Sequence, residues 1–278
     1  MTSPDDTGPL GPRDLDRYLT RIGHHGDRTP TLATLQDVVA RQTEAIAFEN
    51  LTPLTGAPVL LEPDDLQDKL VARHRGGYCY ELNLLTADAL RALGYAVTPL
   101  AARVVWNRPE TDETPRNHLL LRVDLPEGPH LVDTGFGGLT LTGVLRLEAG
   151  PAQATPHEPF RLQARGDGFV LQADIGGTWR SLYLFDLQPQ LRVDAAVGSW
   201  YTSTHPGSLF VNHLLAGRPT PERRYALSGN VHTVHHRGGP SEQTRLTTVA
   251  AIEAVLERDF LLDLAGIDGL RAALARFV

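Results

Sequence analysis

Arg75-Gly-Gly-Tyr-Cys79-Tyr-Glu-Leu-Asn83-Leu-Leu-Thr-Ala-Asp-Ala-Leu-Arg-Ala-Leu-Gly94 is the stretch that decides how the first third of the chain folds. Its apolar residues recur at helical spacing and form one stripe, made of Leu82, Leu85, Ala89 and Leu93. Glycine is the usual residue just past a helix end, so Gly94 is expected to terminate this helix. The pattern predicts a buried helix with Cys79 at its start.

The residues before this helix also favour helical structure. An apolar stripe that begins after Asp14 stops at Gly23, and a second one follows Thr31. Residues 1–12 are rich in Pro, Gly and Asp and have little apolar surface to bury, so they predict a disordered leader. A helical region is therefore expected over residues 13–94.

Beyond Gly94 the apolar residues alternate with a period of two, which is typical of strands with one buried face. Turns rich in Pro, Gly and Asp separate the runs, for example at residues 126–129 and 166–168. The predicted strands are residues 96–106, 118–124, 131–134, 160–164, 169–173 and 179–184. Residues 95–198 are therefore expected to form an antiparallel sheet or barrel. Residues 199–278 mix strand and helix patterns, which gives an α+β fold overall.

Composition excludes several classes of function. The formal net charge is −7, with 33 acidic and 26 basic residues, and no run of Lys or Arg could neutralise adjacent phosphates, so nucleic acid is not an expected partner. No apolar stretch approaches the roughly 18 residues of a membrane-spanning helix, and the first residues lack the features of a signal peptide. With a single Cys and no internal disulfide, a cytoplasmic protein without a membrane partner is expected.

Cys79 is a candidate nucleophile. A lone Cys is most often a small buried apolar residue, and a thiol of ordinary pKa, about 8.5, is only slightly ionised at neutral pH. A helix N-terminus and a cationic neighbour both favour the thiolate, and the start of the predicted helix supplies the first. The glycines at 76 and 77 would let backbone N–H groups approach an oxyanion closely.

His118 is the candidate cationic neighbour among 11 histidines. It opens the predicted strand 118–124, which turns through residues 126–129 into a strand that ends near Asp133. A hairpin with this turn returns Asp133 to within a residue or two of His118. A carboxylate beside an imidazole favours the imidazolium, which in turn favours thiolate on a nearby Cys. Periodicity does not show whether this hairpin packs against Cys79.

The segment from Arg75 to Asn83 closely resembles the nucleophile motif of the arylamine N-acetyltransferases. Other segments resemble landmarks of that family in the same order: residues 18–23, 48–51, 118–121, 132–138 and 200–210. The resemblance implies a helical bundle in residues 13–94, a β-barrel in 95–198 and an α/β lid in 199–278. It also implies a triad of Cys79, His118 and Asp133.

The family resemblance further implies a ping-pong acetyl transfer from acetyl-coenzyme A to arylamines, arylhydrazines or similar amines, with no permanently bound cofactor. By analogy with the family, the pocket for the acyl group and the amine would be lined by Phe48, Val104, Phe136 and Phe210. Residues bordering the coenzyme would be Asn117, Gly135, Gly137 and Gly138. Either a monomer or a homodimer is compatible with the sequence.

Three other functions remain open at this stage. An amide synthase that takes a carrier-bound acyl chain would use the same triad, and a thiol hydrolase would use water or a Lys amine as acceptor. A binding module that only retains the fold would have a slowly alkylated Cys79. No metal site is predicted, because His232, His235 and His236 alternate between two faces of a predicted strand and are expected to be exposed.

Overall fold

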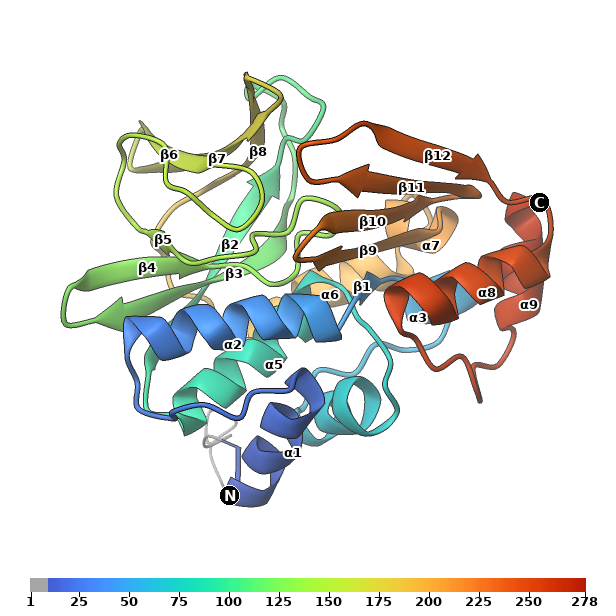
Figure 1. Cartoon of the computed structure of the whole chain (residues 1–278), viewed down its shortest axis with the longest axis horizontal. Helices are drawn as coiled ribbons and strands as arrows, with labels where there is room; N and C mark the ends of the chain where they lie inside the picture. The colour runs from blue at the N-terminus through green and yellow to red at the C-terminus, as the bar shows by residue number, and fades with distance from the viewer. Residues whose placement is uncertain (1–9) are drawn as a thin grey trace.

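Helix α5 (Cys79–Ala92) lies at the centre of the helical part of the molecule and contacts helices α1 and α2 and strands β2 and β3. The computed structural model describes residues 10–278 (Figure 1). The remaining elements of this part are α1 (Pro12–Ile22), α2 (Leu32–Ala45), β1 (Phe48–Glu49), α3 (Leu51–Thr55), α4 (Pro63–Leu66) and the π-helical turn η1 (Gln67–Ala72). The predicted leader lies mostly outside the described residues.

The predicted helix starts and ends have local causes in the structure. Helix α1 ends at Gly23, which has a φ of 69°, a conformation that a residue with a side chain rarely adopts. The side chain of Thr31 accepts a hydrogen bond from the backbone N–H of Thr34 and so caps the start of α2. Gly94, just past α5, has a φ of 93°.

Seven antiparallel strands of the described chain form a nearly closed barrel, in the order β5-β4-β3-β2-β8-β7-β6. Beyond β5 the chain reaches β6, where the N–H of Gly150 donates to the carbonyl of Leu162. Apolar side chains of these strands fill the interior. The strands are β2 (Ala96–Val104), β3 (Arg116–Leu125), β4 (Gly128–Val132), β5 (Leu145–Arg146), β6 (Phe160–Arg165), β7 (Gly168–Ile175) and β8 (Thr178–Phe185).

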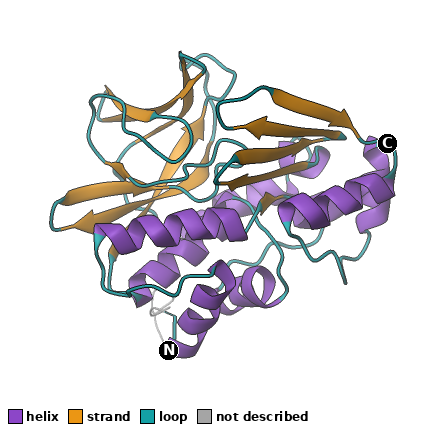
Figure 2. Ribbon diagram, in the orientation of Figure 1, coloured by secondary structure: helices purple, strands orange, loops and turns teal. Residues whose placement is uncertain are grey.

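A second antiparallel sheet, in the order β1-β9-β10-β11-β12, packs against helix α8. Its elements are β9 (Leu215–Thr220), β10 (Arg223–Ser228), β11 (Val231–His236) and β12 (Ser241–Arg245), followed by α8 (Val249–Phe260), α9 (Leu270–Leu274) and the turn η2 (Ala275–Phe277). Along the chain, α6 (Arg192–Thr204) and α7 (Leu209–Asn212) connect the last barrel strand to the first long strand of this sheet. Figure 2 shows the strands gathered on one side of the molecule and most helices on the other. The predicted α+β fold is confirmed.

The C-terminal sheet takes one strand from the helical part, because Phe48 and Glu49 of β1 pair with Gly217 and Ala216 of β9. The predicted boundary between residues 198 and 199 falls within helix α6. Among residues 10–278, no helix combines the length and the apolar character needed to cross a membrane.

Leu162 tests the barrel core, since it is fully buried inside the barrel. We expect Leu162→Ala to lower the free energy of unfolding by about 2–5 kcal/mol, because the cavity it leaves is not refilled. The matched control is Leu191→Ala at a site that is 53% exposed, where the change should stay within about 0.5 kcal/mol. Urea unfolding followed by circular dichroism measures both, and equal effects would contradict a closed apolar core.

Candidate active site

Asp133 and His118 meet at the end of the hairpin formed by β3 and β4. Pairing of Leu121 with Val132 ends the ladder, so the chain leaves β4 beside the start of β3. The Nε2 atom of His118 lies 2.7 Å from Oδ2 of Asp133, and both side chains are buried. This contact fixes the ring and directs its other nitrogen, Nδ1, away from the carboxylate.

Cys79 lies against the same hairpin. It is the first residue of α5 and is only 3% exposed. Its Sγ donates a weak hydrogen bond, 3.8 Å long, to the backbone carbonyl of Asn117, the residue before His118. The structure therefore brings Cys79, His118 and Asp133 together, which periodicity alone did not establish.

The electrostatics of this group favour an ion pair. Burial alone would lower the pKa of His118, but the charge and hydrogen bond of Asp133, with smaller contributions from Cys79, raise it to about 10. Burial likewise acts to raise the pKa of Asp133, yet His118, the N–H of Gly135 and the Asn83 amide together hold it below its ordinary value. Imidazolium beside carboxylate is therefore the favoured state at neutral pH.

Asn83, one helical turn after Cys79, ties the Asp133 loop to α5. Its amide nitrogen donates to Oδ1 of Asp133 at 3.1 Å and to the carbonyl of Leu119 at 2.7 Å. Its amide oxygen accepts from the N–H of Thr134 at 3.0 Å. The sequence placed Asn83 in the motif without giving it a role. The signal that could have found it is its i+4 spacing from Cys79, which puts both residues on one helix face.

Gly135 and Gly137 are explained by close packing. A Cβ atom on Gly135 would lie 2.7 Å from Cα of Cys79 and 2.9 Å from Nδ2 of Asn83. Gly137 has a φ of 93°, and a Cβ there would lie 3.3 Å from the ring of Phe48. Gly138, in contrast, is exposed and would have nothing within 4 Å of its Cβ. The loop after Asp133 therefore packs directly on the nucleophile helix.

Two clusters of aromatic rings adjoin the residues of this group. The Phe136 and Tyr183 rings lie 5.3 and 5.0 Å from the His118 ring. Tyr183 is fully buried, and its hydroxyl has no hydrogen-bond partner among the described residues. A second aromatic cluster includes Tyr78, the residue before Cys79: the Phe210 ring lies 6.0 Å from Phe48 and 5.5 Å from Tyr78.

Val104 and Asn117 lie nearby on the barrel strands. Val104, at the end of β2, is half-buried and pairs in register with Tyr183. Asn117 is half-buried in β3 and contributes its carbonyl to the Cys79 contact. The sequence did not single out Tyr183, although its position opposite Val104 follows once the strand order is known.

Asn50 holds Phe210 in place. Its amide nitrogen donates to the carbonyls of Phe210 and His213 at 2.8 and 2.7 Å, and its oxygen accepts from the N–H of Leu215. Asn50 is fully buried. These three contacts join the segment after β1 to the chain that enters β9.

The three histidines of β11 have separate partners. Within residues 10–278, no group of three or more His, Cys, Asp or Glu residues could hold a metal ion. The expectation that all three are exposed is wrong for His232, which is buried 3.2 Å from Asp259 because the sheet packs on α8. His235 and His236 instead contact Ser241 and Glu242 of the neighbouring strand.

Comparisons with known proteins place this geometry in a family. The N-acetyltransferase family matches residues 31–268. An arylamine N-acetyltransferase of Mycobacterium tuberculosis is 49% identical over 265 residues, which cover 94% of this chain and 93% of that protein. The chain belongs to the arylamine N-acetyltransferase family. The predicted family and the predicted enzyme class, an acyltransferase with arylamine N-acetyltransferase activity, are confirmed.

Solved structures of family members have the same fold. The arylamine N-acetyltransferase of Mycobacterium marinum is 46% identical and superimposes with a TM-score of 0.92, covering 95% of this chain and 99% of that one. Its complex with CoA is 45% identical over the same shares of the two chains and gives a TM-score of 0.91. The likeness therefore extends through all three parts of the chain, including the C-terminal sheet.

Gly135→Ala tests the packing of the Asp133 loop on α5. The new methyl group would clash with Cα of Cys79, so the loop must move and carry Asp133 away from His118. Because a displacement of about 1 Å can reduce turnover about 100-fold, we expect at least that loss in steady-state acetylation assays. Gly150→Ala is the control, since it has open space around its Cβ and should retain full activity. Equal activity of the two variants would contradict the tight contact.

Asp133→Asn tests the source of the raised His118 pKa. The amide removes the negative charge and leaves burial, so the His118 pKa should fall from about 10 to 6.5 or below. Activity should fall about 10²–10⁴-fold, because the imidazole loses its orientation and its charged form. Nuclear magnetic resonance of ¹⁵N-labelled histidine measures the titration, and an unchanged His118 pKa would refute the assignment.

Asp133→Asn should also lower the stability of the protein, by an amount that depends on pH. The raised His118 pKa gives stability that is fully present below pH 6.5 and is lost as pH rises through about 10. The lowered Asp133 pKa gives stability that is present above about pH 4 and is lost as pH falls through the folded-state value. Wild type should therefore exceed Asp133→Asn in stability most between about pH 4 and 6.5.

Proposed function

We propose that this chain transfers an acetyl group from acetyl-coenzyme A to the nitrogen of arylamines, arylhydrazines or similar amines, through an acetyl thioester on Cys79. The observation that carries the proposal is the meeting of Cys79 with the buried His118–Asp133 pair, in a member of the arylamine N-acetyltransferase family. The M. marinum relative in complex with CoA supports the choice of donor.

The first half-reaction acylates the enzyme. Cys79, as thiolate beside the His118 imidazolium, attacks the thioester carbonyl of acetyl-coenzyme A. Backbone N–H groups at the start of α5 are proposed to stabilise the oxyanion of the tetrahedral intermediate. When that intermediate collapses, the bond from carbon to the coenzyme sulfur breaks and His118 gives its proton to the leaving thiolate. One thioester replaces another, so the step is nearly balanced in free energy.

The second half-reaction transfers the acetyl group to the amine. An aromatic amine is weakly basic and enters uncharged, so its lone pair can attack the acetyl carbon of acetyl-Cys79. His118, now neutral, removes the proton from the nitrogen as the bond to Sγ breaks. The products are the amide and the original thiolate–imidazolium pair, and the kinetics are ping-pong. Formation of an amide from a thioester makes this half-reaction favourable.

Roles for the remaining residues follow from their surroundings. Phe48, Phe136 and Phe210, together with Val104, are proposed to line the pocket for the acyl group and the ring of the amine. Gly135, Gly137 and Gly138, with Asn117, are proposed to border the pantetheine end of the coenzyme. Gly135 has no room for a side chain beside Cys79, which supports a place for this loop next to the nucleophile.

The decisive experiment uses the purified protein and acetyl-coenzyme A without an amine. Intact mass should rise by one acetyl group, about 42 Da, as expected for a covalent acyl intermediate. Peptide mapping should place the group on Cys79, and addition of an arylhydrazine should remove it. Cys79→Ser is the control and should show no adduct that a hydrazine removes.

Each outcome of this experiment decides between functions. An acetyl adduct on Cys79 that the hydrazine releases supports the proposal. Absence of an adduct, with Cys79 still rapidly alkylated by iodoacetamide, would overturn acetyl-coenzyme A as donor and indicate an amide synthase that uses a carrier-bound acyl chain. Slow alkylation at neutral pH would indicate a protein that retains the fold without catalysis.

A further inference from the structure

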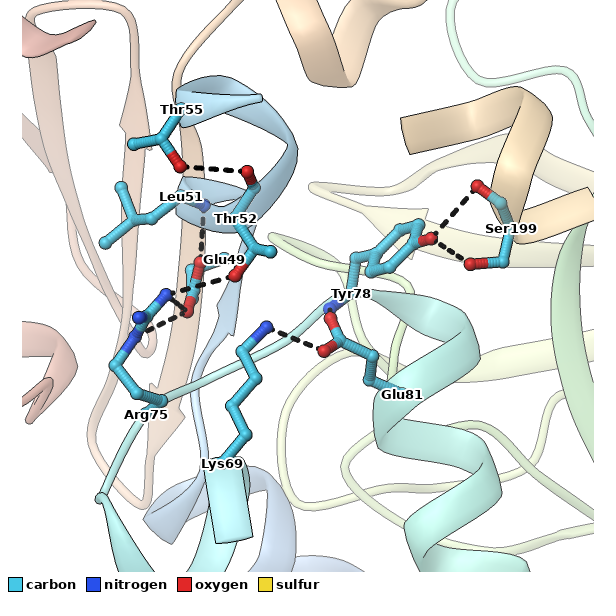
Figure 3. Close-up of polar contacts among 9 residues, drawn as sticks. All are labelled: Glu49, Leu51, Thr52, Thr55, Lys69, Arg75, Tyr78, Glu81 and Ser199. Atoms are coloured by element: carbon cyan, nitrogen blue, oxygen red, sulfur yellow. Dashed lines mark hydrogen bonds and ion pairs between the residues drawn. The ribbon is translucent and has the colours of Figure 1, made fainter. Parts of the chain in front are cut away.

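Four charged side chains form a cluster close to the start of α5, which we call the charge cluster: Glu49, Arg75 and Glu81, which are buried, and Lys69, whose side chain is 18% exposed. Figure 3 shows the two ion pairs, Arg75 with Glu49 and Lys69 with Glu81, on either side of the backbone that leads to Tyr78. Their shortest N–O distances are 2.9 and 2.6 Å. Both carboxylates are 1% exposed, so water contributes little to their stabilisation.

Glu81 holds the start of helix α5. It is the third residue of the helix, and its Oε2 accepts a hydrogen bond of 3.2 Å from the backbone N–H of Tyr78, the residue before the helix. This is the acidic half of a capping box. A Cβ atom on Gly77 would lie 2.9 Å from the same oxygen, so the chain passes directly over the carboxylate. Glu81 therefore fixes the backbone that leads into Cys79.

A charge on Glu81 has a direct bearing on Cys79, which lies two residues away. Burial raises the pKa of Glu81, and the neighbouring Glu49 adds to the effect, whereas Lys69 opposes both. A buried carboxylate without a cation would also disfavour a second negative charge on the thiolate. Lys69 cancels this charge while leaving the carboxylate free to accept the Tyr78 hydrogen bond.

Lys69 reaches Glu81 from an uncommon piece of backbone. It belongs to the π-helical turn η1, in which the N–H of Arg73 donates to the carbonyl of Asp68. Such turns are rare and often occur at functional sites. His74, just beyond it, has a φ of 49°, which is unusual for a residue with a side chain. Both amide atoms of Gln67 are buried without a partner in the described part of the chain.

We propose that Lys69 and Glu81 are positioning residues for Cys79. The pair fixes the first turn of α5 through the Tyr78 N–H, and it keeps the surroundings of the thiolate electrically neutral. Neither residue touches the substrate in this proposal. It rests on the proposed function only in that Cys79 is the nucleophile. With the Arg75–Glu49 pair, the charge cluster contains two acidic and two basic side chains and has no net charge.

The test compares Lys69→Met, Glu81→Gln and the double variant in the full-length protein. The rate of Cys79 alkylation by iodoacetamide is measured at pH values from 5 to 9. The rate of acetylation is measured over the same pH range by following the release of coenzyme A. Lys69→Met leaves a carboxylate unbalanced, so both profiles should move to higher pH by about one unit. Glu81→Gln keeps the amide oxygen for the Tyr78 N–H and leaves a cation unbalanced, so both profiles should move to lower pH.

The double variant and a control at an exposed ion pair show whether the shifts come from the charges of Lys69 and Glu81. With both charges removed and the hydrogen bond to Tyr78 retained, the double variant should return to the wild-type profile within about 0.3 pH units. Arg271→Met is the control, because it removes a cation from an ion pair of the same length, 2.6 Å, at a side chain that is 71% exposed. It should leave both profiles unchanged.

A purely structural role would lower the melting temperature of both single variants without moving either profile, and that result would overturn the proposal. Shifts of the two single variants in the same direction would overturn it as well. If Lys69→Met fails to fold, Glu81→Gln and the double variant carry the same comparison. Alkylation needs no acyl donor, so failure of the wild type to form an acetyl adduct is distinguishable from failure of this proposal.

Discussion

Burial of helix α5 is the constraint on which the rest of the structure depends, since every residue from Cys79 to Leu90 is buried. Polar groups in such a helix need partners, because an unpaired buried group is costly. Four of its side chains bind three other parts of the chain: Glu81 binds Lys69 of the π-helical turn, Asn83 and Thr86 bind Asp133 and Thr134 of one loop, and Asp88 binds Arg192 of helix α6. The contacts that satisfy the buried polar groups of the helix therefore also fix the barrel and α6 around Cys79.

Stability alone does not explain these contacts. Replacing a buried ion pair by apolar residues of similar volume is often neutral or stabilising, so such a pair is weak evidence for a role in stability. An ion pair or a side-chain amide has a directional interaction, which apolar packing lacks. Asn83 determines where Asp133 lies relative to Cys79, and apolar packing against the same loop would allow it to slide. We infer that the polar contacts around α5 set the distances between the groups they join.

Local signals in the sequence were sufficient for helices α1, α2 and α5 and for six of the barrel strands. The start of α2 at Thr31, the stop of α1 at Gly23 and the hairpin that carries His118 all depend on residues close together in the chain, and each was predicted. Helix α6 was not predicted, and its exposed face explains why: Val193, Val197 and Trp200 are apolar yet more than 60% exposed, so they obscure the amphipathic pattern. The strand Ser241–Arg245 is exposed throughout and has no apolar face to signal it.

In the candidate site, too, local features could be predicted from the sequence and long-range contacts could not. Cys79, His118 and Asp133 could be proposed from a helix start and a hairpin, and the family resemblance joined the two. Contacts such as Asn50 with Phe210, separated by 160 residues, carry no local pattern. His232 was misjudged for a similar reason, because alternation along a strand does not reveal that a helix covers one of its faces.

The charges around Cys79 also explain how one histidine can serve both half-reactions. Glu49 with Arg75 and Glu81 with Lys69 are balanced pairs that the proposed reaction leaves unchanged, so the charges that it removes and restores are those of the Cys79 thiolate and the His118 imidazolium. Interactions with Cys79 contribute to the raised pKa of His118. Acetylation removes the thiolate and its hydrogen bond, so His118 then holds its proton less strongly. The histidine is therefore a better acid while coenzyme A is leaving, and it becomes a stronger base again as the bond from the acetyl carbon to Sγ breaks and the thiolate returns.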